Sequence, residues 1–393
     1  MELTNTMSLK KVLDMLFYDA MENNPRDPKN LTAVPFILGA PGGGKTKMLE
    51  GKVEKVNWAL LTAHLSTKTI EEMTGLPQFY KMMVNNKPVD GTRWTFPEMI
   101  TAVTELANNH EGVILFLDDF HLASPENQKF CFQLFTDYSL KGYDLPPNCH
   151  IMLAGNPGAK AGAKTMLSAI TNRVAFYPVH SDFDDWKNWS MTAGINPIIT
   201  TFLAKKSNQK FFHEDENSRE PWGSPRSWHK FSLALGSSIK RTNGNIDLDE
   251  VMYRANGHVG SEGGREFSMY YELYSKIDTS AVFDKKNFKF KTDSTNMFIF
   301  CMAMAYEYID RFMAGKDAKD VKVLKDLVDT MSKLSTEIAK ADKDMSIVML
   351  KEIAEMANSY DAAMIVDVLD HIDKHDKPLF ESVIKITKSI KET

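Results

Sequence analysis

The chain has 393 residues, of which 43% are hydrophobic and 25% are charged, and its formal net charge is -5. This is the composition of a globular protein with room for two or three domains, and it excludes disordered and collagen-like chains. The net negative charge argues against a strongly basic, nucleic-acid-binding surface over the whole chain, although it leaves room for a local basic patch.

The three cysteines lie far apart in the sequence, at Cys131, Cys149 and Cys301. Their spacing indicates neither a disulfide framework nor a zinc site, and it fits a reducing compartment. The N-terminus lacks the cationic run and apolar segment of a signal peptide, and no apolar stretch approaches membrane-spanning length. We therefore expect a cytoplasmic protein without membrane insertion.

The first predicted elements are a helix and a strand. Apolar residues recur at helical spacing from Ser8 to Asn24, with Ser8 in the N-cap position, and residues 24–30 then break the helix. The apolar run at residues 34–38 predicts a buried strand. It leads into the glycine-rich turn Gly39-Ala40-Pro41-Gly42-Gly43-Gly44-Lys45-Thr46, and a helix-compatible segment follows.

A strand, a glycine-rich turn and a helix in this order are the context of a P-loop, whose backbone N–H groups wrap a polyphosphate. Glycine adopts positive φ and lets the main chain close around an anion, and the helix adds the dipole of its N-terminus. Lys45 is expected to reach the β- and γ-phosphates, and the Thr46 hydroxyl to bind Mg²⁺. The predicted nucleotide-binding residues are Gly39, Pro41, Gly42, Gly43, Gly44, Lys45 and Thr46.

Strands and helices alternate in the next part of the chain. Residues 59–65 fit a second buried strand, residues 69–77 a short helix and turn, and residues 97–107 a further helix. This alternation predicts a fold of the α/β class, with a central parallel sheet covered by helices on both faces.

The second functional motif is an acidic strand end. Residues 113–117 are apolar throughout, as in a strand buried on both faces, and Asp118 and Asp119 follow at its carboxyl end. Ligands of α/β sheets bind at such ends, and the pattern matches a Walker B element. Asp118 is expected to hold Mg²⁺ through water, and Asp119 to orient and deprotonate the attacking water.

A third strand end carries an amide. Residues 150–155 predict a short apolar strand that runs into Asn156-Pro157. From there the Asn156 side chain can hydrogen-bond the γ-phosphate or the lytic water. A lone Asn-Pro pair usually marks only a turn, and this one gains weight because it follows the Walker B element by one helix and one strand.

The order of these motifs resembles that of the AAA+ ATPases, specifically the MoxR-like branch. The resemblance covers roughly residues 30 to 275, and it includes the segments Met166-Leu167-Ser168-Ala169-Ile170-Thr171-Asn172-Arg173-Val174 and Ser224-Pro225-Arg226-Ser227-Trp228. It implies a P-loop αβα sandwich with a helical lid. The motifs in this order are much more specific than any one of them alone.

The same resemblance assigns roles to three residues. It implies that Asn156 is the sensor-1 residue, that Arg173 is an arginine finger that reaches the nucleotide of a neighbouring subunit, and that Arg226 is the sensor-2 residue of the lid. A guanidinium suits this task because it stays protonated and donates in a fork to phosphoryl oxygens. Asn172 and Arg265 are lower-ranked alternatives for these roles.

One position departs from the family pattern. The Walker B strand of the family usually ends in Asp-Glu, whereas this chain has Asp118-Asp119, whose second carboxylate is one methylene shorter. Because a displacement of about 1 Å can cost on the order of a hundredfold in rate, we predict a slow ATPase. The cofactors are expected to be ATP and Mg²⁺, the metal-binding residues Thr46 and Asp118, and the catalytic residues Asp119, Asn156, Arg173 and Arg226.

The resemblance also implies partners. MoxR-like proteins assemble as homo-oligomers, usually hexameric rings, and remodel protein partners that often contain a von Willebrand type A domain. The AAA+ superfamily includes nucleic-acid motors and loaders as well, which is the alternative function. The low overall charge and the lack of a basic cluster favour a protein partner, since duplex binding mainly follows phosphate neutralisation. A GTP-specific relative is a weaker third possibility.

Helices are expected in the rest of the chain, where residues 228–235, 249–255 and 264–277 are the predicted lid helices. Beyond residue 278 the resemblance ends, and the pattern predicts an additional C-terminal helical domain. The predicted division is an N-terminal helix (1–30), a nucleotide-binding domain (31–205), a lid (206–280) and a C-terminal helical extension (281–393).

His371 and His375 have the spacing of a metal pair on one helix face. No third ligand is evident beside them, so we interpret them as part of a solvated polar face.

Overall fold

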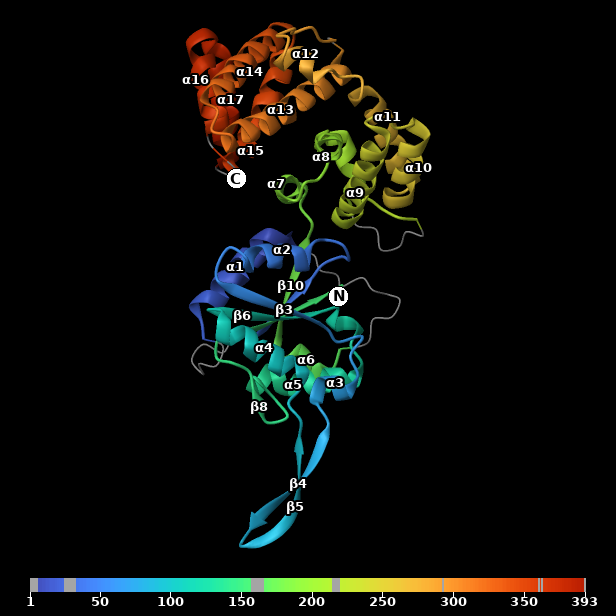
Figure 1. Ribbon diagram of the computed structural model, residues 1–393, viewed down its shortest axis with the longest axis vertical. Helices are drawn as coiled ribbons and strands as arrows, with labels where there is room; N and C mark the ends of the chain where they lie inside the picture. The colour runs from blue at the N-terminus through green and yellow to red at the C-terminus, as the bar shows by residue number, and fades with distance from the viewer. Residues whose placement is uncertain are drawn as a thin grey trace. The chain divides into compact units, whose positions relative to one another are not determined.

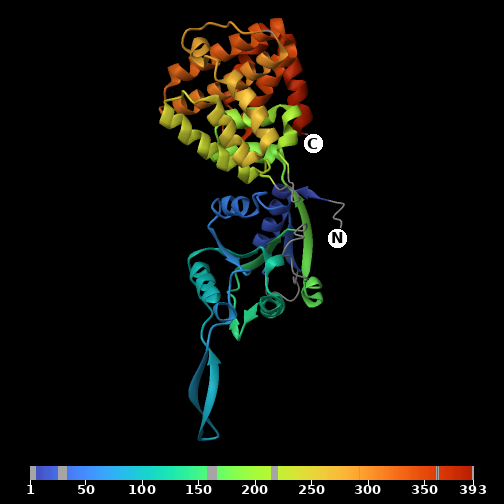
Figure 2. The same ribbon diagram turned by 90° about the vertical axis from the view of Figure 1, so that its right-hand side faces the viewer.

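The computed structural model describes residues 6–24, 33–156, 166–213, 220–291, 293–359, 361 and 363–391. They form two compact units, which Figures 1 and 2 show from two sides. The α/β unit consists mainly of residues 1–185 with the short segment 224–226, and the helical unit mainly of residues 186–213 and 227–393. The domain boundaries predicted from the sequence stay a prediction.

The strands of the central sheet run parallel, in the order β1-β10-β2-β9-β6-β3. The strands predicted at residues 34–38, 59–65, 113–117 and 150–155 are all present in it. Because parallel strands end on the same edge of a sheet, the residues that follow β2, β6 and β9 lie along one edge. The strands are β1 Met7–Ser8, β2 Val34–Leu38, β3 Trp58–His64, β6 Gly112–Asp118, β9 Cys149–Gly155 and β10 Val174–His180.

Helices cover both faces of the sheet (Figure 1). Strand β6 shows why: Ile114 and Phe116 belong to the core shared with α1 and α2, whereas Leu115 and Leu117 belong to the core shared with α4 and α5. All four side chains are fully buried, as a two-sided strand requires. The predicted αβα sandwich is confirmed. Its helices are α1 Leu9–Glu22 and α2 Lys45–Val53 on one face, and α3 Ile70–Thr74, α4 Glu98–Asn109, α5 Pro125–Asp137 and α6 Ser168–Thr171 on the other.

Side-chain caps explain where several of these helices begin. The Ser8 hydroxyl accepts a hydrogen bond from the Lys11 N–H at 3.4 Å, so Ser8 is the N-cap of α1 as predicted. Thr69 and Glu72 form a reciprocal capping box at the start of α3. Each cap satisfies backbone N–H groups that the helix itself leaves without a partner.

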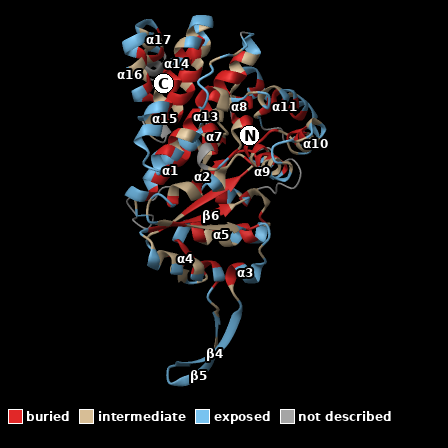
Figure 3. Cartoon of the chain, turned by 45° about the horizontal axis from the view of Figure 1, so that its top comes forward, coloured by how far each residue is buried: buried red, intermediate tan, exposed pale blue. Residues whose placement is uncertain are grey.

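A β-hairpin that the sequence did not predict stands between α3 and α4. Strand β4 (Pro77–Val84) pairs antiparallel with β5 (Lys87–Trp94), and the turn residues Asn85 and Asn86 have φ of 50° and 57°. Two residues with positive φ are typical of a type I′ hairpin turn. Nearly every residue of both strands is exposed (Figure 3), so the hairpin has no buried face.

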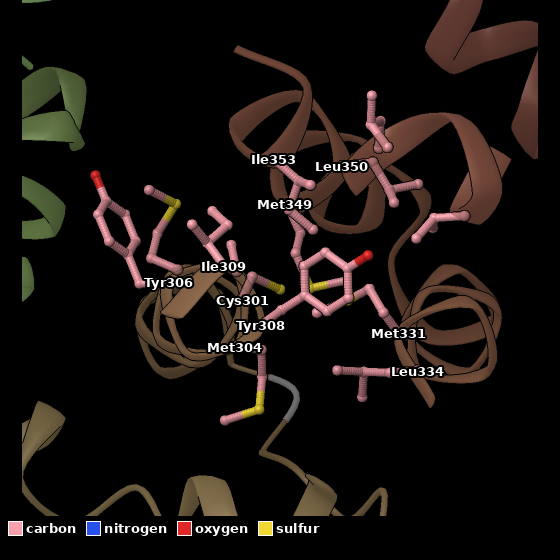
Figure 4. Close-up of a cluster of buried hydrophobic side chains, with 14 of the residues drawn as sticks. Cys301, Met304, Tyr306, Tyr308, Ile309, Met331, Leu334, Met349, Leu350 and Ile353 are labelled. Carbon is pink, nitrogen blue, oxygen red and sulfur yellow. The ribbon is translucent and has the colours of Figure 1, made fainter. Parts of the chain in front are cut away.

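The helical unit confirms the predicted C-terminal helices. Its largest core lies among α13, α14 and α15, where Tyr308 and Cys301 meet Met331 and Leu350 (Figure 4). The Tyr308 hydroxyl donates to the Met364 carbonyl at 2.7 Å, which ties α16 to the same core. The helices are α7 Phe183–Thr192, α8 Pro197–Ala204, α9 Pro225–Thr242, α10 Leu248–Val259, α11 Ser261–Tyr274, α12 Thr279–Phe283, α13 Ser294–Asp317, α14 Val321–Ala341, α15 Lys343–Ser359, α16 Ala363–His375 and α17 Lys377–Lys391.

The C-terminal helices share this core with earlier parts of the unit. Tyr274 and Ile277, at the end of α11, pack against it. A buried ion cluster adds a second link, because Lys187 Nζ of α7 contacts Glu352 Oε2 at 3.0 Å and Glu355 Oε2 at 2.6 Å on α15. Burial lowers the pKa of Lys187, but the two carboxylates outweigh it and the net shift is upward. The lysine is therefore charged at neutral pH.

All three cysteines are buried, Cys131 and Cys149 in the α/β unit and Cys301 in the helical unit. Burial raises the pKa of Cys301 to about 12 and that of Cys131 well above its ordinary value. Among the described helices, none is long and apolar enough to cross a membrane.

Candidate functional site

The predicted P-loop connects β2 to α2 at the carboxyl edge of the sheet. Gly42 and Gly44 have φ of 83° and 90°, in the left-handed region that favours glycine. The Gly39 N–H donates to the Gly155 carbonyl at 3.1 Å, which ties the loop to β9. Gly44 is the N-cap of α2 and makes no side-chain hydrogen bond to the first turn, and the positive end of the helix dipole at this position favours an anion.

Lys45 folds back over the loop. Its Nζ donates to the Gly39 carbonyl at 2.7 Å and to the Ala40 carbonyl at 3.0 Å. Pro41 and Gly43 complete the turn, with the Gly43 N–H donating to the Ala40 carbonyl at 3.4 Å. Phosphate oxygens would compete with these carbonyls for the same ammonium group, as its predicted role requires.

Thr46 and Asp118 are brought together from the start of α2 and the end of β6. The Thr46 hydroxyl donates to Asp118 Oδ2 at 2.9 Å, and the other carboxylate oxygen accepts from the Asp119 N–H at 2.9 Å. Hydroxyl and carboxylate oxygens are the hard ligands that Mg²⁺ prefers. Together with Lys45 and the open N-terminus of α2, this donor set fits a Mg²⁺-bound polyphosphate.

Asp119 has an unusual backbone conformation. Its φ of 52° and ψ of 35° lie in the left-handed region, and it is the N-cap of the short 3-10 helix η1, Phe120–Leu122. Aspartate and asparagine enter this region more readily than residues with longer side chains. The structure thus offers a local reason for aspartate at this position, rather than the glutamate that is usual in the proteins whose motif order this chain resembles.

Asn156 follows β9 at the same edge, and its neighbour is a residue that the sequence reasoning missed. The Asn156 N–H donates to Nδ1 of His121 at 3.2 Å. His121 lies in η1, directly after Asp119 and Phe120. The one sequence signal for it was its position three residues after Asp118, the predicted Walker B aspartate. Burial lowers the pKa of His121, as does Lys45, whereas Asp119 and Asp118 raise it. Pro157, which completes the predicted motif, lies outside the described residues.

Arg226 is also brought to the P-loop, from far along the chain. It lies in the first turn of α9, and its N–H donates to the Gly42 carbonyl at 3.3 Å. A Cβ on Gly42 would lie 3.1 Å from the Ser224 hydroxyl and 3.3 Å from the Arg226 Cβ, so glycine permits this close approach. The Arg226 side chain is exposed beside the loop.

Arg173 does not join these residues. It directly precedes β10, and its carbonyl accepts from the N–H of Val34 at the start of β2. It therefore lies at the amino edge of the sheet, and the five residues of β2, at about 3.3 Å each, separate it from the P-loop. Its guanidinium contacts Thr136 Oγ1 at 2.9 Å and lies over the Phe132 ring at 3.9 Å.

The lower-ranked residues lie elsewhere. Asn172 is exposed next to Arg173, and Arg265 is exposed on α11 in the helical unit. The rings of His371 and His375 lie 4.7 Å apart on α16, and the structure assembles no group of three metal-ligating side chains among the residues it describes.

No family model matches the chain, and no curated protein matches it. Among solved structures, the Holliday junction branch migration motor RuvB of Thermotoga maritima matches at 12% identity and a TM-score of 0.34, over 70% of this chain and 74% of that chain. A single-residue variant of the same protein matches at 10% identity and a TM-score of 0.36, over 71% and 76%. A likeness at this level carries no conclusion about the activity of this chain.

Proposed function

We propose that this chain is a Mg²⁺-dependent ATPase of the AAA+ type that acts as a homo-oligomer. The observation that supports this most strongly is that the predicted site residues lie at two opposite edges of one sheet. Lys45, Thr46, Asp118 and Asn156 lie at the carboxyl edge, and Arg173 lies at the amino edge. An arginine in that position is suited to the site of a neighbouring copy, as the resemblance to AAA+ proteins implies.

The proposed reaction is attack of water on the γ-phosphorus of ATP, with cleavage of the bond to the β-phosphate oxygen. Lys45 binds the β- and γ-phosphates, and Thr46 and Asp118 hold Mg²⁺, which neutralises phosphate charge when it is bound. Asp119 accepts the proton of the attacking water. Asn156 orients that water or the γ-phosphate, and Arg173 and Arg226 stabilise the transferring phosphoryl group.

We further propose that the work is remodelling of a protein partner, as in the MoxR-like branch, and that the assembly is a hexameric ring. A von Willebrand type A domain is the partner class that this branch implies. A ring would bring Arg173 of each copy to the P-loop of the next, because a head-to-tail interface repeated around an axis closes on itself.

The exposed hairpin β4–β5 favours a protein over a nucleic acid. Phe79 is 84% exposed and Met83 is 65% exposed, and Met82, Val84 and Val89 are exposed as well. Methionine and valine suit adaptable apolar contacts with polypeptide, whereas the exposed rings of Phe79 and Tyr80 could pack against a protein or stack on bases. The hairpin carries three cationic residues and one acidic residue, too few to neutralise many phosphates.

The ATPase proposal is tested by phosphate release from the wild type, Lys45→Ala and Asp119→Asn in Mg-ATP. We expect slow turnover by the wild type, loss of nucleotide binding in Lys45→Ala, and retained binding without turnover in Asp119→Asn. Equal background rates for all three proteins would rule out the enzyme.

The partner class is tested with the Asp119→Asn variant, which should hold its substrate in ATP. We expect it to retain a denatured protein such as reduced casein when ATP is present, and Lys45→Ala to retain none. Salt-dependent retention of a single-stranded oligonucleotide, with stimulation of the wild-type ATPase, would instead support the nucleic-acid motor. Competition between ATP and GTP for the wild type would reveal a preference for GTP.

A further inference from the structure

His121 is held rigidly at the edge where the site residues meet. The preceding residue, Phe120, is fully buried, and its ring lies edge-on to Phe36 at 5.9 Å and tilted against Phe135 at 5.8 Å. The turn is closed by the Leu122 N–H, which donates to the Asp119 carbonyl at 2.9 Å. The backbone of His121 is therefore fixed relative to Asp119.

The imidazole bridges this turn to the end of β9. Its Nδ1 accepts the Asn156 N–H at 3.2 Å, and a Cβ on Gly155 would lie 3.2 Å from the same nitrogen and 2.7 Å from the Phe36 ring. Only glycine at position 155 leaves room for the ring to approach the strand so closely. The contact joins two segments that are 35 residues apart in the chain.

The hydrogen bond also selects one form of the ring. An acceptor Nδ1 requires neutral imidazole with its proton on Nε2. Burial is the largest cause that lowers the pKa of His121, so the neutral form is favoured at neutral pH. Within the described part of the chain, Nε2 has no protein hydrogen-bond partner.

We propose that His121 is a positioning residue for ATP hydrolysis: through Nδ1 it holds the backbone of Asn156 in register with the turn that carries Asp119. This inference rests on the proposed ATPase function and assigns a role that neither the P-loop nor the acidic strand end supplies. The two groups that must flank the attacking water come from different strands, and His121 is the side chain that joins the ends of those strands. The ladder between β6 and β9 pairs the strands only as far as Leu117 and Leu153, so loss of this bridge removes one contact that fixes the residues beyond the ladder relative to each other.

The test compares two substitutions that each retain one half of the imidazole. In His121→Asn, the amide oxygen takes the place of Nδ1 and can still accept the Asn156 N–H. In His121→Gln, the longer side chain places its polar atoms near the position of Nε2 and leaves the Asn156 N–H without this acceptor. We expect His121→Asn to retain kcat within about threefold of the wild type, and His121→Gln to lose on the order of a hundredfold in kcat with KM changed less than about threefold, because the damage is to alignment.

A purely structural role would give a different result. If His121 only satisfied a buried amide, His121→Gln would lower the melting temperature and leave kcat of the folded protein unchanged, which would overturn the inference. Loss of kcat in His121→Asn with kcat retained in His121→Gln would also overturn it, since that outcome assigns the role to Nε2. Loss in both variants would overturn it as well, because an acceptor in the place of Nδ1 would then not be sufficient. A wild type without turnover would instead refute the underlying ATPase proposal.

The tautomer of the His121 ring can be measured in the wild-type protein, so this test does not depend on the stability of a variant. Long-range proton–nitrogen correlation spectra of the wild type with ¹⁵N-labelled histidine should show His121 as the Nε2-protonated form, with the signal assigned by its absence from His121→Asn. An Nδ1-protonated ring would contradict the hydrogen bond on which the inference rests.

Discussion

Asp119 has a proposed catalytic role and a backbone conformation that few residues adopt. A longer side chain would bring the carboxylate closer to the attacking water, whereas the left-handed backbone favours a short side chain. Substitution Asp119→Glu should extend the carboxylate by one methylene, to the reach of the glutamate that is usual in the AAA+ proteins that the motif order resembles. It also places a longer side chain at a φ of 52°, where non-glycine residues cost roughly 1–3 kcal/mol. We expect kcat to rise, by up to on the order of a hundredfold, while the free energy of unfolding falls by about 1 kcal/mol.

Phosphate release and urea denaturation measure these two effects separately. Asp119→Asn is the matched control for stability, because asparagine tolerates the left-handed region and should unfold at nearly the wild-type urea concentration. A glutamate variant that is as stable as the asparagine variant and no faster than the wild type would contradict both parts of the prediction.

Arg173 allows a test of the composite site by mixing two inactive variants. Arg173→Ala should bind nucleotide and fail to turn it over, and Lys45→Ala should fail to bind. In mixed assemblies, an intact Arg173 from one variant faces an intact P-loop of the other, so activity should return. If the mixture stays inactive, Arg173 does not act on a neighbouring copy. Thr136→Val, which removes the 2.9 Å contact to Arg173 Nε, controls for local structure.

At the residue scale, the sequence predicted what depends on local spacing. Gly42 and Gly44 occur in a glycine-rich pattern that favours positive φ, and the structure confirms their positive φ angles. The contact of Lys45 with phosphates stays a prediction. His121 could not be predicted to contact Asn156, because that contact depends on how η1 packs against β9. A single histidine forms no spaced pattern in the sequence from which its contacts could be predicted.

At the scale of elements, substitutions in the hairpin β4–β5 should weaken contact with a protein partner and leave ATP turnover unchanged. A double substitution of Phe79 and Met83 by serine removes exposed apolar surface, and the strands keep their backbone pairing. If a bound polypeptide such as reduced casein stimulates phosphate release by the wild type, we expect this stimulation to be lost and basal phosphate release to stay within about twofold of the wild type, because exposed apolar surface of this kind marks an interaction site.

The turn of the same hairpin offers the matched control. Asn86→Gly retains the positive φ of 57° that the turn requires, so both activities should persist. Equal stimulation of the serine variant and the wild type would show that the hairpin does not contact the polypeptide.

His150, in strand β9, should make the free energy of unfolding depend on pH. His150 stacks against Trp58 at 5.3 Å, and burial lowers its pKa from 6.5 to about 4. As the pH falls, the unfolded chain binds the proton near pH 6.5 and the folded chain only near pH 4. The stabilisation present above pH 6.5 is therefore lost between pH 6.5 and 4, by about 3 kcal/mol at most, since each pKa unit corresponds to about 1.4 kcal/mol.

Urea denaturation of the wild type and His150→Gln at several pH values between 7.5 and 4.5 checks this. The glutamine variant should lose much of the slope in that window. Parallel pH profiles for the two proteins would show that another group carries the dependence.

The sheet and the long helices were predictable because burial leaves a pattern in the sequence. In the two-sided strand β6 it is a continuous apolar run, and in α1 it is apolar residues at helical spacing. The hairpin β4–β5 was not, because a strand exposed on both faces has no alternation of apolar and polar residues to detect. The asparagine pair at 85 and 86 was its only local signal, and a turn predicts a hairpin only when strands are recognised on both sides of it.

At the scale of the whole molecule, the cluster of Lys187, Glu352 and Glu355 joins the first helix of the helical unit to the C-terminal helices. The Tyr306 hydroxyl donates to Glu352 Oε1 at 3.2 Å and extends the network. Lys187→Met should destabilise the unit by about 3 kcal/mol or more, because it leaves the buried Glu352 carboxylate and the half-buried Glu355 carboxylate without their cation. Urea denaturation measures the loss, and adding Glu352→Gln should restore part of it. A fully additive double variant would show that the two groups are not coupled.

Each of the two cores contains a buried thiol, so the reactivity of the native cysteines can be used to measure how often each core opens. A thiol reagent modifies a buried cysteine only when its surroundings open, so the rate of modification measures the free energy of that opening. Mg-ATP at about 100 times its Kd should slow the modification of Cys131 by about a hundredfold, since it binds only the folded α/β unit. Cys301, in the core of the other unit, should react at an unchanged rate if the two units open independently. Mass spectrometry of the labelled peptides would thus show, in one unmodified protein, how far the energy of nucleotide binding spreads along the chain.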